Sequence, residues 1–223
     1  MSSEFQRANF YANPGTVILD GVMTPEQLDA KVPPEVTAIL SFGLCGGLAP
    51  SVKVGDGFIY EAVITPAPTN LATYRANLAW MNALAKATGF PVAPCWSSGE
   101  FNTGDSITQR DLLYARSRCP VIDDESFSVA VFAKKRGIPF CGLRVASDGM
   151  ANKLPPAIRD ALRPDGSDNL WAVVKSVIEQ PTDPATGGWQ FDELLKTAAD
   201  SKMAFDALDT ACVRVGPTFG WAA

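Results

Sequence analysis

The sequence predicts a three-layer α/β domain in which helices cover both faces of a mainly parallel sheet. Its 223 residues suffice for one compact domain, and no polar linker or shift of composition divides them. Short apolar runs typical of buried strands alternate with helical patterns along the chain. Hydrophobic residues make up 47% of the sequence, as is usual for a globular protein. We therefore expect a single domain over residues 1–223.

The first half of the chain contains three expected strands and two expected helices. The strands are residues 16–19, 36–42 and 57–64, each rich in β-branched or aromatic side chains. A helix is expected to start at Thr24, with Pro25 at its first position and Gln27 three residues after the cap. A second helix is expected over residues 71–87, ending at Gly89.

The second half continues the alternation of strands and helices. Weak strands are expected at residues 91–95 and around Phe101, and further strands at 120–122 and 140–145. Residues 109–117 and 124–136 read as helices, the second with acids in its first turn, bases in its last turn and Gly137 as its stop. Three more helices are expected at residues 155–162, 169–179 and 191–211.

Composition excludes several classes of function. The net charge of −5 argues against a general nucleic-acid binder, which needs a basic surface. Apolar runs are too short to span a membrane, and the first residues do not resemble a signal peptide, so we expect a cytoplasmic protein. The five cysteines form no C-x-x-C pair, which favours reduced thiols over a zinc site or disulfides.

The chain contains no histidine. This excludes catalytic triads and dyads that use histidine, together with histidine-ligated metals. Acid–base chemistry must therefore come from Asp, Glu, Lys, Tyr or Cys side chains, and no metal site is expected.

Three segments are expected at the carboxyl ends of strands, where ligands bind in such sheets. They are the glycine cluster at residues 43–47, which is expected to be a loop, the acids at residues 123–125, and Ser147 with Asp148. Taken singly, the acids are also typical of a helix cap and Asp148-Gly149 of a turn. The glycine cluster matches neither the dinucleotide fingerprint nor the phosphate-binding loop of nucleotide triphosphatases. A right-handed crossover would nevertheless bring Glu125 and Asp148 to the same edge.

The combination is more specific than its parts. The order is SFGLCGGLAP at 41–50 with VGD at 54–56, TGD at 103–105, IDDES at 122–126, and GIPF at 137–140 with LRVASD at 143–148. This order resembles the motifs of the nucleoside phosphorylase and methylthioadenosine nucleosidase superfamily over about half of the chain. The resemblance implies a three-layer fold with a mixed central sheet and cleavage of the N-glycosidic bond of a purine nucleoside.

The C-terminal third is similar to one branch of that superfamily. LPPA at 154–157, ALRPDG at 161–166 and LWAVV at 170–174 resemble the hopanoid-associated phosphorylases, which implies release of adenine from adenosylhopane. Two alternatives stay open. One is a methylthioadenosine or adenosylhomocysteine nucleosidase, and the other is a non-catalytic member that only binds a nucleoside.

The resemblance also implies roles for individual residues. Asp148 is the general acid that protonates the purine at N7, Ser147 orients it, and Glu125 binds the ribose hydroxyls and stabilises the cationic sugar. Such an acid needs a desolvated site that keeps it protonated. Arg144 is expected to be structural. The remaining substrate contacts are Gly43, Leu44, Cys45, Gly46, Ile107, Asp123 and Asp124. No cofactor is implied, although phosphate is an open co-substrate, and a homo-oligomer is expected.

Three departures from the family pattern bear on activity. Asp124 stands where the family has a methionine beneath the ribose. Leu44 and Ser41 replace a serine and an arginine that bind phosphate in some members, which leaves Arg7 as another cation that could fold back to the site. The family also opens with a central strand that would precede Glu4, so we expect a sheet lacking that strand.

Overall fold

A computed structural model describes residues 3–21, 23–67, 70–97, 107–150, 182 and 190–221. The strand expected around Phe101 and the helices expected at 155–162 and 169–179 lie outside these residues. In chain order the elements are α1 (Ser3–Tyr11), α2 (Pro25–Lys31), β1 (Ile39–Gly47), β2 (Gly57–Pro66), β3 (Leu71–Arg75), α3 (Leu78–Thr88), β4 (Val92–Trp96), α4 (Ile107–Ser117), β5 (Val121–Ile122), α5 (Ser126–Arg136), β6 (Phe140–Asp148) and α8 (Gln190–Val215).

The described strands form one mixed sheet in the order β3-β2-β4-β5-β1-β6. The pairs β1–β6, β2–β4 and β4–β5 are parallel, whereas β1–β5 and β2–β3 are antiparallel. The beginning of β2 also pairs with β6, with Gly57 opposite Val145. As a result β6 has a hydrogen-bonded neighbour on both sides, and the sheet curls back on itself. The expected mixed α/β sheet is confirmed.

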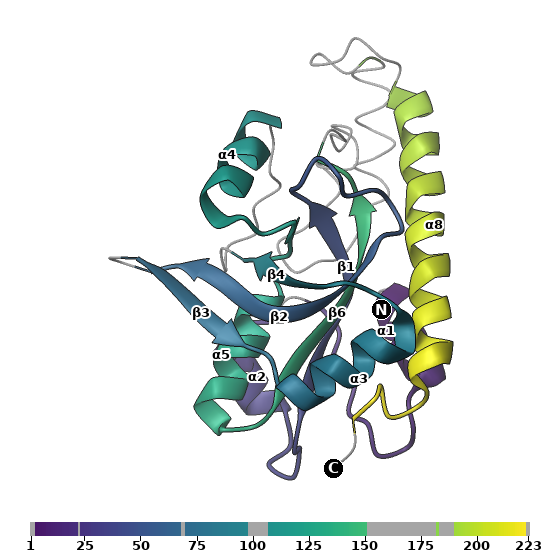
Figure 1. Cartoon of the computed structure of the whole chain (residues 1–223). Coiled ribbons are helices and arrows are strands. Elements are labelled where there is room, and N and C mark those ends of the chain that lie inside the picture. Colours follow the sequence, from purple (N-terminus) through teal and green to yellow (C-terminus); the bar gives the residue numbers. More distant parts are fainter. Residues whose placement is uncertain are drawn as a thin grey trace.

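Helices cover the two faces of this sheet (Figure 1), and a large hydrophobic cluster lies on each face. On one face, α3 and the long α8 cover β6, and Leu84 and Leu208 pack there with Leu143 and Val145. On the other face, α5 brings Ala130 and Ala133 against side chains of β2, β4 and β5. Side chains alternate between faces along a strand, so β6 contributes to both clusters. This is the expected three-layer arrangement.

The helix ends confirm the expectations from capping residues. Thr24 and Gln27 form a capping box at the start of α2, with Pro25 in the first turn. Gly89 and Gly137 end α3 and α5 in the left-handed conformation, at φ 76° and 67°. Glycine adopts this conformation without the steric cost that a side chain would bring.

Four expectations about local structure are wrong. Residues 16–19 form no strand, and β1 begins only at Ile39. The glycine cluster at 43–47 is not a loop, because β1 continues through it to Gly47. Residues 71–75 form the edge strand β3, and the helix begins only after the Asn77 cap, whose side chain accepts a hydrogen bond from the Trp80 amide. Helix α1 was not expected.

No helix in the described ranges is long and apolar enough to cross a membrane.

Candidate active site

The end of β6 lies beside the glycine segment, residues 43–47 of β1. The two strands pair in parallel, with Gly43 opposite Arg144, and a bulge after Cys45 sets Gly46 opposite Asp148. A Cβ atom on Gly46 would lie 3.4 Å from Oδ1 of Asp148, and one on Gly47 would lie 2.9 Å from its carbonyl oxygen. The absence of side chains here therefore lets the Asp148 carboxylate lie directly against the β1 backbone.

Both oxygens of the Asp148 carboxylate have partners. The Ser147 hydroxyl lies 3.0 Å from Oδ1 and 3.2 Å from the Cys45 carbonyl oxygen, so it links Asp148 to β1. This geometry fits the expected orienting role of Ser147. Oδ2 accepts a hydrogen bond of 2.5 Å from Nη1 of Arg110, a residue of α4.

Arg110 is the site residue that sequence reasoning missed. Its side chain is 8% exposed, and the same Nη1 lies 3.0 Å from the carbonyl oxygen of Gly149 and 3.3 Å from that of Gly47. The sequence placed this arginine only on an expected helix, and no motif marked it. The Arg110 guanidinium occupies the oxygen through which the expected general acid would meet the base.

Glu125 is linked to the glycine segment through Arg144. It is the N-cap of α5, and its half-exposed carboxylate accepts a 2.6 Å hydrogen bond from Nη1 of Arg144. Arg144 is almost fully buried, and it also donates to the Leu44 carbonyl oxygen at 3.0 Å and to the Ser41 hydroxyl at 2.6 Å. Arg144 thus fixes Glu125 relative to β1, in agreement with its expected structural role.

Asp123 is directed into the protein rather than toward a ligand. Its carboxylate accepts hydrogen bonds from the Tyr60 hydroxyl at 2.7 Å, from the Ser126 hydroxyl at 2.8 Å, and from the backbone amides of Glu125 and Ser126. The residue is 8% exposed, and Nε of Arg144 lies 3.8 Å from Oδ2. Asp123 therefore starts helix α5 and balances the charge of Arg144, which is the capping alternative and not the expected substrate contact.

Burial and charge shift the pKa values of the groups beneath the site. Burial raises the pKa of Tyr60 well above its usual value, and the nearby Asp123 carboxylate raises it further. Burial and Asp123 likewise raise the thiol pKa values of Cys45 and Cys95. Burial would lower the pKa of Arg144, but the Asp123 and Glu125 carboxylates raise it well above the usual value for arginine. The thiols and Tyr60 are thus neutral at physiological pH, and Arg144 is charged.

The contacts described above do not include the other predicted residues. Asp124 is partly buried, and none of the contacts described above involves it. Ile107 is the first residue of α4, but its side chain is not among those described, and TGD at 103–105 lies outside the described residues. Arg7 does not reach the glycine segment, because it pairs with Asp209 at 3.0 Å and lies over the Phe205 ring.

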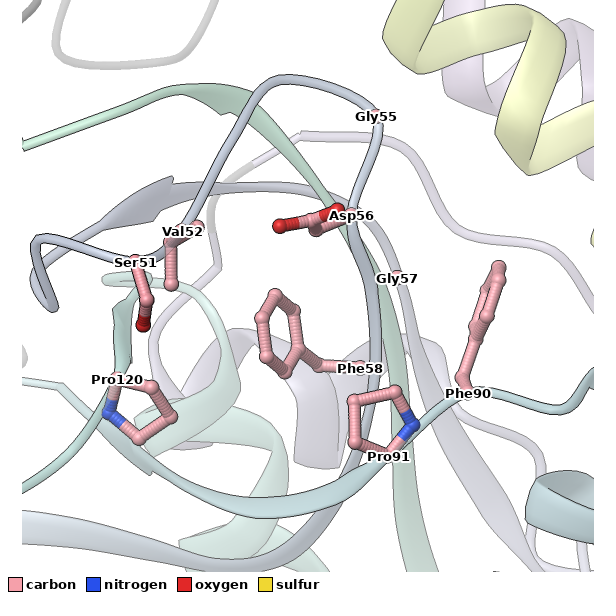
Figure 2. Close-up of a pocket in the computed structure, with 9 residues that line it drawn as sticks. All are labelled: Ser51, Val52, Gly55, Asp56, Gly57, Phe58, Phe90, Pro91 and Pro120. Atoms are coloured by element: carbon pink, nitrogen blue, oxygen red, sulfur yellow. The ribbon is translucent and has the colours of Figure 1, made fainter.

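A separate pocket of about 430 Å³ opens near the beginnings of β2, β4 and β5 (Figure 2). It is lined by Ser51, Val52, Gly55, Asp56, Gly57, Phe58, Phe90, Pro91 and Pro120. None of the predicted site residues is among them. The Asp56 carboxylate accepts a hydrogen bond from the Lys53 amide within its own turn. The pocket is thus a mainly apolar hollow, distinct from the Asp148 and Glu125 arrangement.

Comparison with known proteins places this site in context. The family model for the phosphorylase superfamily matches residues 12–179. A search of curated proteins finds no match.

Among solved structures, S-adenosylhomocysteine nucleosidase from Streptococcus pyogenes matches with a TM-score of 0.50 and 14% identity, covering 79% of this chain and 67% of that one. The 5′-methylthioadenosine/S-adenosylhomocysteine nucleosidase of Campylobacter jejuni matches with a TM-score of 0.48 and 15% identity, covering 78% and 75%. A futalosine hydrolase mutant of Helicobacter pylori matches with a TM-score of 0.45 and 17% identity, and this chain spans 58% of its length, with 50% of this chain covered. At these identities the likeness concerns the fold.

Proposed function

This chain belongs to the phosphorylase superfamily, and on that premise we propose that it cleaves the N-glycosidic bond of a purine nucleoside. The observation that carries the proposal is that both acids are tied to the glycine segment, Asp148 through Ser147 and Glu125 through Arg144. Cleavage of this bond needs a proton for the departing base and negative charge near the developing ribosyl cation. Two carboxylates held at one strand can supply both.

In the proposed reaction Asp148 is the general acid. It donates a proton to the purine at N7, and the bond between C1′ and N9 breaks with its electron pair going to the base, which leaves as a neutral molecule. A water molecule then bonds to C1′ of the ribosyl cation and loses a proton, which can return to Asp148, so that free sugar is formed. Ser147 is a positioning residue, because its hydroxyl ties Oδ1 of Asp148 to the Cys45 carbonyl oxygen. The Arg110 guanidinium must leave Oδ2 before this oxygen can contact the base.

Glu125 is proposed to face the ribose. Its side chain is 43% exposed, so part of the carboxylate is free of the protein interior while Arg144 holds the other part. Contacts that strengthen as the sugar becomes cationic accelerate the reaction rather than merely tighten binding. The ribose would therefore lie over the glycine segment between the two carboxylates.

The favoured substrate is an adenosyl compound with a large apolar tail, of which adenosylhopane is our specific candidate. This choice is based on the resemblance of residues 154–174 to the hopanoid-associated branch, and these residues lie outside the described ones. Methylthioadenosine or adenosylhomocysteine would be the substrate if the chain is an ordinary nucleosidase. A non-catalytic nucleoside binder is favoured by one observation, namely that both oxygens of Asp148 already have protein partners.

A substrate panel with an acid-site variant tests the proposal. Adenosylhopane, methylthioadenosine and adenosylhomocysteine are each incubated with the wild type, with Asp148→Asn and with Asp111→Asn, an exposed acid on α4 that serves as the control. We expect free adenine from the wild type and the control, and a loss of about 10²–10⁴-fold with Asp148→Asn. Turnover of Asp148→Asn at the wild-type rate would refute the acid assignment. Binding without adenine release from any substrate would favour the non-catalytic alternative.

A further inference from the structure

Arg110 is placed where the edge of the purine base must lie if the proposed function is correct. One of its nitrogens, Nη1, faces three acceptors at once: Oδ2 of Asp148, the carbonyl oxygen of Gly149 and the carbonyl oxygen of Gly47. The other terminal nitrogen, Nη2, lies 3.7 Å from the position that a Cβ atom on Gly46 would take. The guanidinium therefore fills the corner between the Asp148 carboxylate and the glycine segment.

The protein groups around the Arg110 guanidinium in this corner all accept hydrogen bonds. A carboxylate and two carbonyl groups offer only acceptors. Each of them needs a donor when the site is closed, because an unpaired buried acceptor is costly. A planar cation with several N–H groups satisfies this set, and the guanidinium does so in the described structure.

A 6-aminopurine that is protonated at N7 has the same character. It is planar and cationic, and it presents two donors side by side, the N7–H and the 6-amino group. Its N7–H would face Asp148, and its amino group would face a carbonyl oxygen that Arg110 vacates. A 6-oxopurine presents an acceptor at position 6 instead, which would face carbonyl oxygens without a hydrogen bond.

We propose that Arg110 competes with the purine base for the same hydrogen-bond acceptors. Its guanidinium occupies the Asp148 carboxylate and the carbonyl oxygens of Gly47 and Gly149, and a 6-aminopurine must displace it in order to bind. This inference is based on the proposed function, since it takes Asp148 to be the residue that meets N7. Arg110 is thus a specificity-determining residue on α4. While Arg110 is in place it occupies Oδ2 of Asp148 and the two carbonyl oxygens, and only a base with donors at both positions restores these hydrogen bonds.

The test uses free adenine and hypoxanthine, whose binding is measured by calorimetry without turnover. Free adenine is neutral, but its N7–H tautomer, the form that leaves after proton transfer to N7, presents the same two donors side by side. Arg110→Met removes the donors while preserving the side chain's apolar stem, and Arg116→Met on the exposed side of the same helix is the matched control. We expect the Arg110→Met protein to bind adenine roughly tenfold more tightly than the wild type, because a charge-assisted contact no longer competes. The Arg116→Met protein should bind adenine as the wild type does.

The wild type alone provides a second measurement, which stays informative if Arg110→Met does not fold. Its affinity for adenine should exceed that for hypoxanthine by about tenfold, the worth of one or two well-formed hydrogen bonds. The proposal is overturned if hypoxanthine binds as tightly as adenine or more tightly, because an arginine that stays in place would pair with O6 and N7 of a 6-oxopurine. Unchanged or weaker adenine binding by Arg110→Met, or no adenine binding at all, overturns it too.

The outcomes separate this inference from the proposed function. Tighter adenine binding by Arg110→Met without any adenine release from nucleosides would sustain the competitor role and refute catalysis. Adenine release by the wild type, with no effect of Arg110→Met on adenine affinity, would support catalysis and refute the competitor role.

Discussion

Replacing Arg144 by methionine should destabilise the protein strongly, because the guanidinium balances two acids in a buried place. Arg144 is 3% exposed and donates to Glu125, to Ser41 and to the carbonyl oxygen of Leu44. Asp123, with Oδ2 3.8 Å from Nε, would be left as a buried charge without its cation. Removing one partner of a buried ion pair typically costs about 3–5 kcal/mol.

Urea unfolding followed by tryptophan fluorescence measures this loss. For a chain of this length about 3–5 kcal/mol corresponds to a fall in Tm of roughly 6–20 °C. Arg75→Met, at an exposed position on β3, is the control and should change stability by less than about 0.5 kcal/mol. A loss below about 1 kcal/mol for Arg144→Met would refute the view that Arg144 neutralises Asp123.

The contribution of Glu125 can be separated from that of Asp123. The Glu125 side chain is 43% exposed, so its ion pair is screened by solvent, and Glu125→Gln alone should cost less than about 1 kcal/mol. Turnover should respond differently, because we expect Glu125→Gln to lower kcat more than it raises KM. If Glu125→Gln destabilises the fold as much as Arg144→Met, the half-exposed acid and not Asp123 dominates the network.

Two further predictions concern the core. Burial raises the pKa of Cys119 to about 11 and those of Cys141 and Cys212 to about 12. Unfolded thiols ionise near pH ~8.5, so the free energy of unfolding should fall as the pH rises above this value, by up to about 1.4 kcal/mol per pH unit for each thiol; equal urea midpoints at neutral and at strongly alkaline pH would contradict this. Gly142→Ala should cost about 1–3 kcal/mol, because its Cβ would lie 2.4 Å from the ring of the fully buried Tyr60, whereas Gly15→Ala makes only an ordinary contact and serves as the control. Equal stability of these two variants would show that Tyr60 can move aside.

The parts of the fold that local chemistry specifies were predictable from the sequence. The capping residues Thr24, Gly89 and Gly137 gave helix ends that the structure confirms. Strand β3 was not predictable in this way, because Leu71–Arg75 pairs with the end of β2, and its apolar residues run on into the helical pattern of α3. The glycine cluster was read as a loop, although pairing with β6 holds it extended.

The site shows the same division between local and distant effects. The position of Asp148 at a strand end sufficed to place it beside the glycine segment. The right-handed crossover expected between residues 120–122 and 140–145 is wrong, because β5 runs antiparallel to β1 whereas β6 runs parallel to it. The partners of Asp148 and Glu125 could not be predicted from the sequence, because the long side chains of Arg110 and Arg144 reach the acids from other elements or positions. Asp123 and Glu125 are separated by one residue, yet one points inward and the other is half exposed. The backbone orientation at the start of α5 decides which of the two acids is buried, and the residue types do not.

The same contacts bear on the role of phosphate. Among the described residues, Arg110 and Arg144 are cations that lie beside the glycine segment, and both already face carboxylates. Ser41 is also engaged, because its hydroxyl lies 2.8 Å from that of Ser126 and accepts from Arg144. A bound phosphate needs several charge-assisted donors to replace its hydration. Arg7, the other cation considered, is paired with Asp209. A phosphate ion would thus have to separate existing ion pairs before it could bind.

We therefore expect base release to depend little on phosphate and to produce free sugar. The assay compares the rate in phosphate with that in phosphate-free buffer containing sulfate at the same ionic strength, and phosphorus NMR identifies any sugar phosphate. Stoichiometric sugar 1-phosphate, with no reaction in the phosphate-free buffer, would contradict the expectation. Because Arg144 is locked between Asp123 and Glu125, the cation that binds phosphate would then be Arg110. Its transfer from Asp148 to the anion would free the acid, and phosphate rather than the base would displace it.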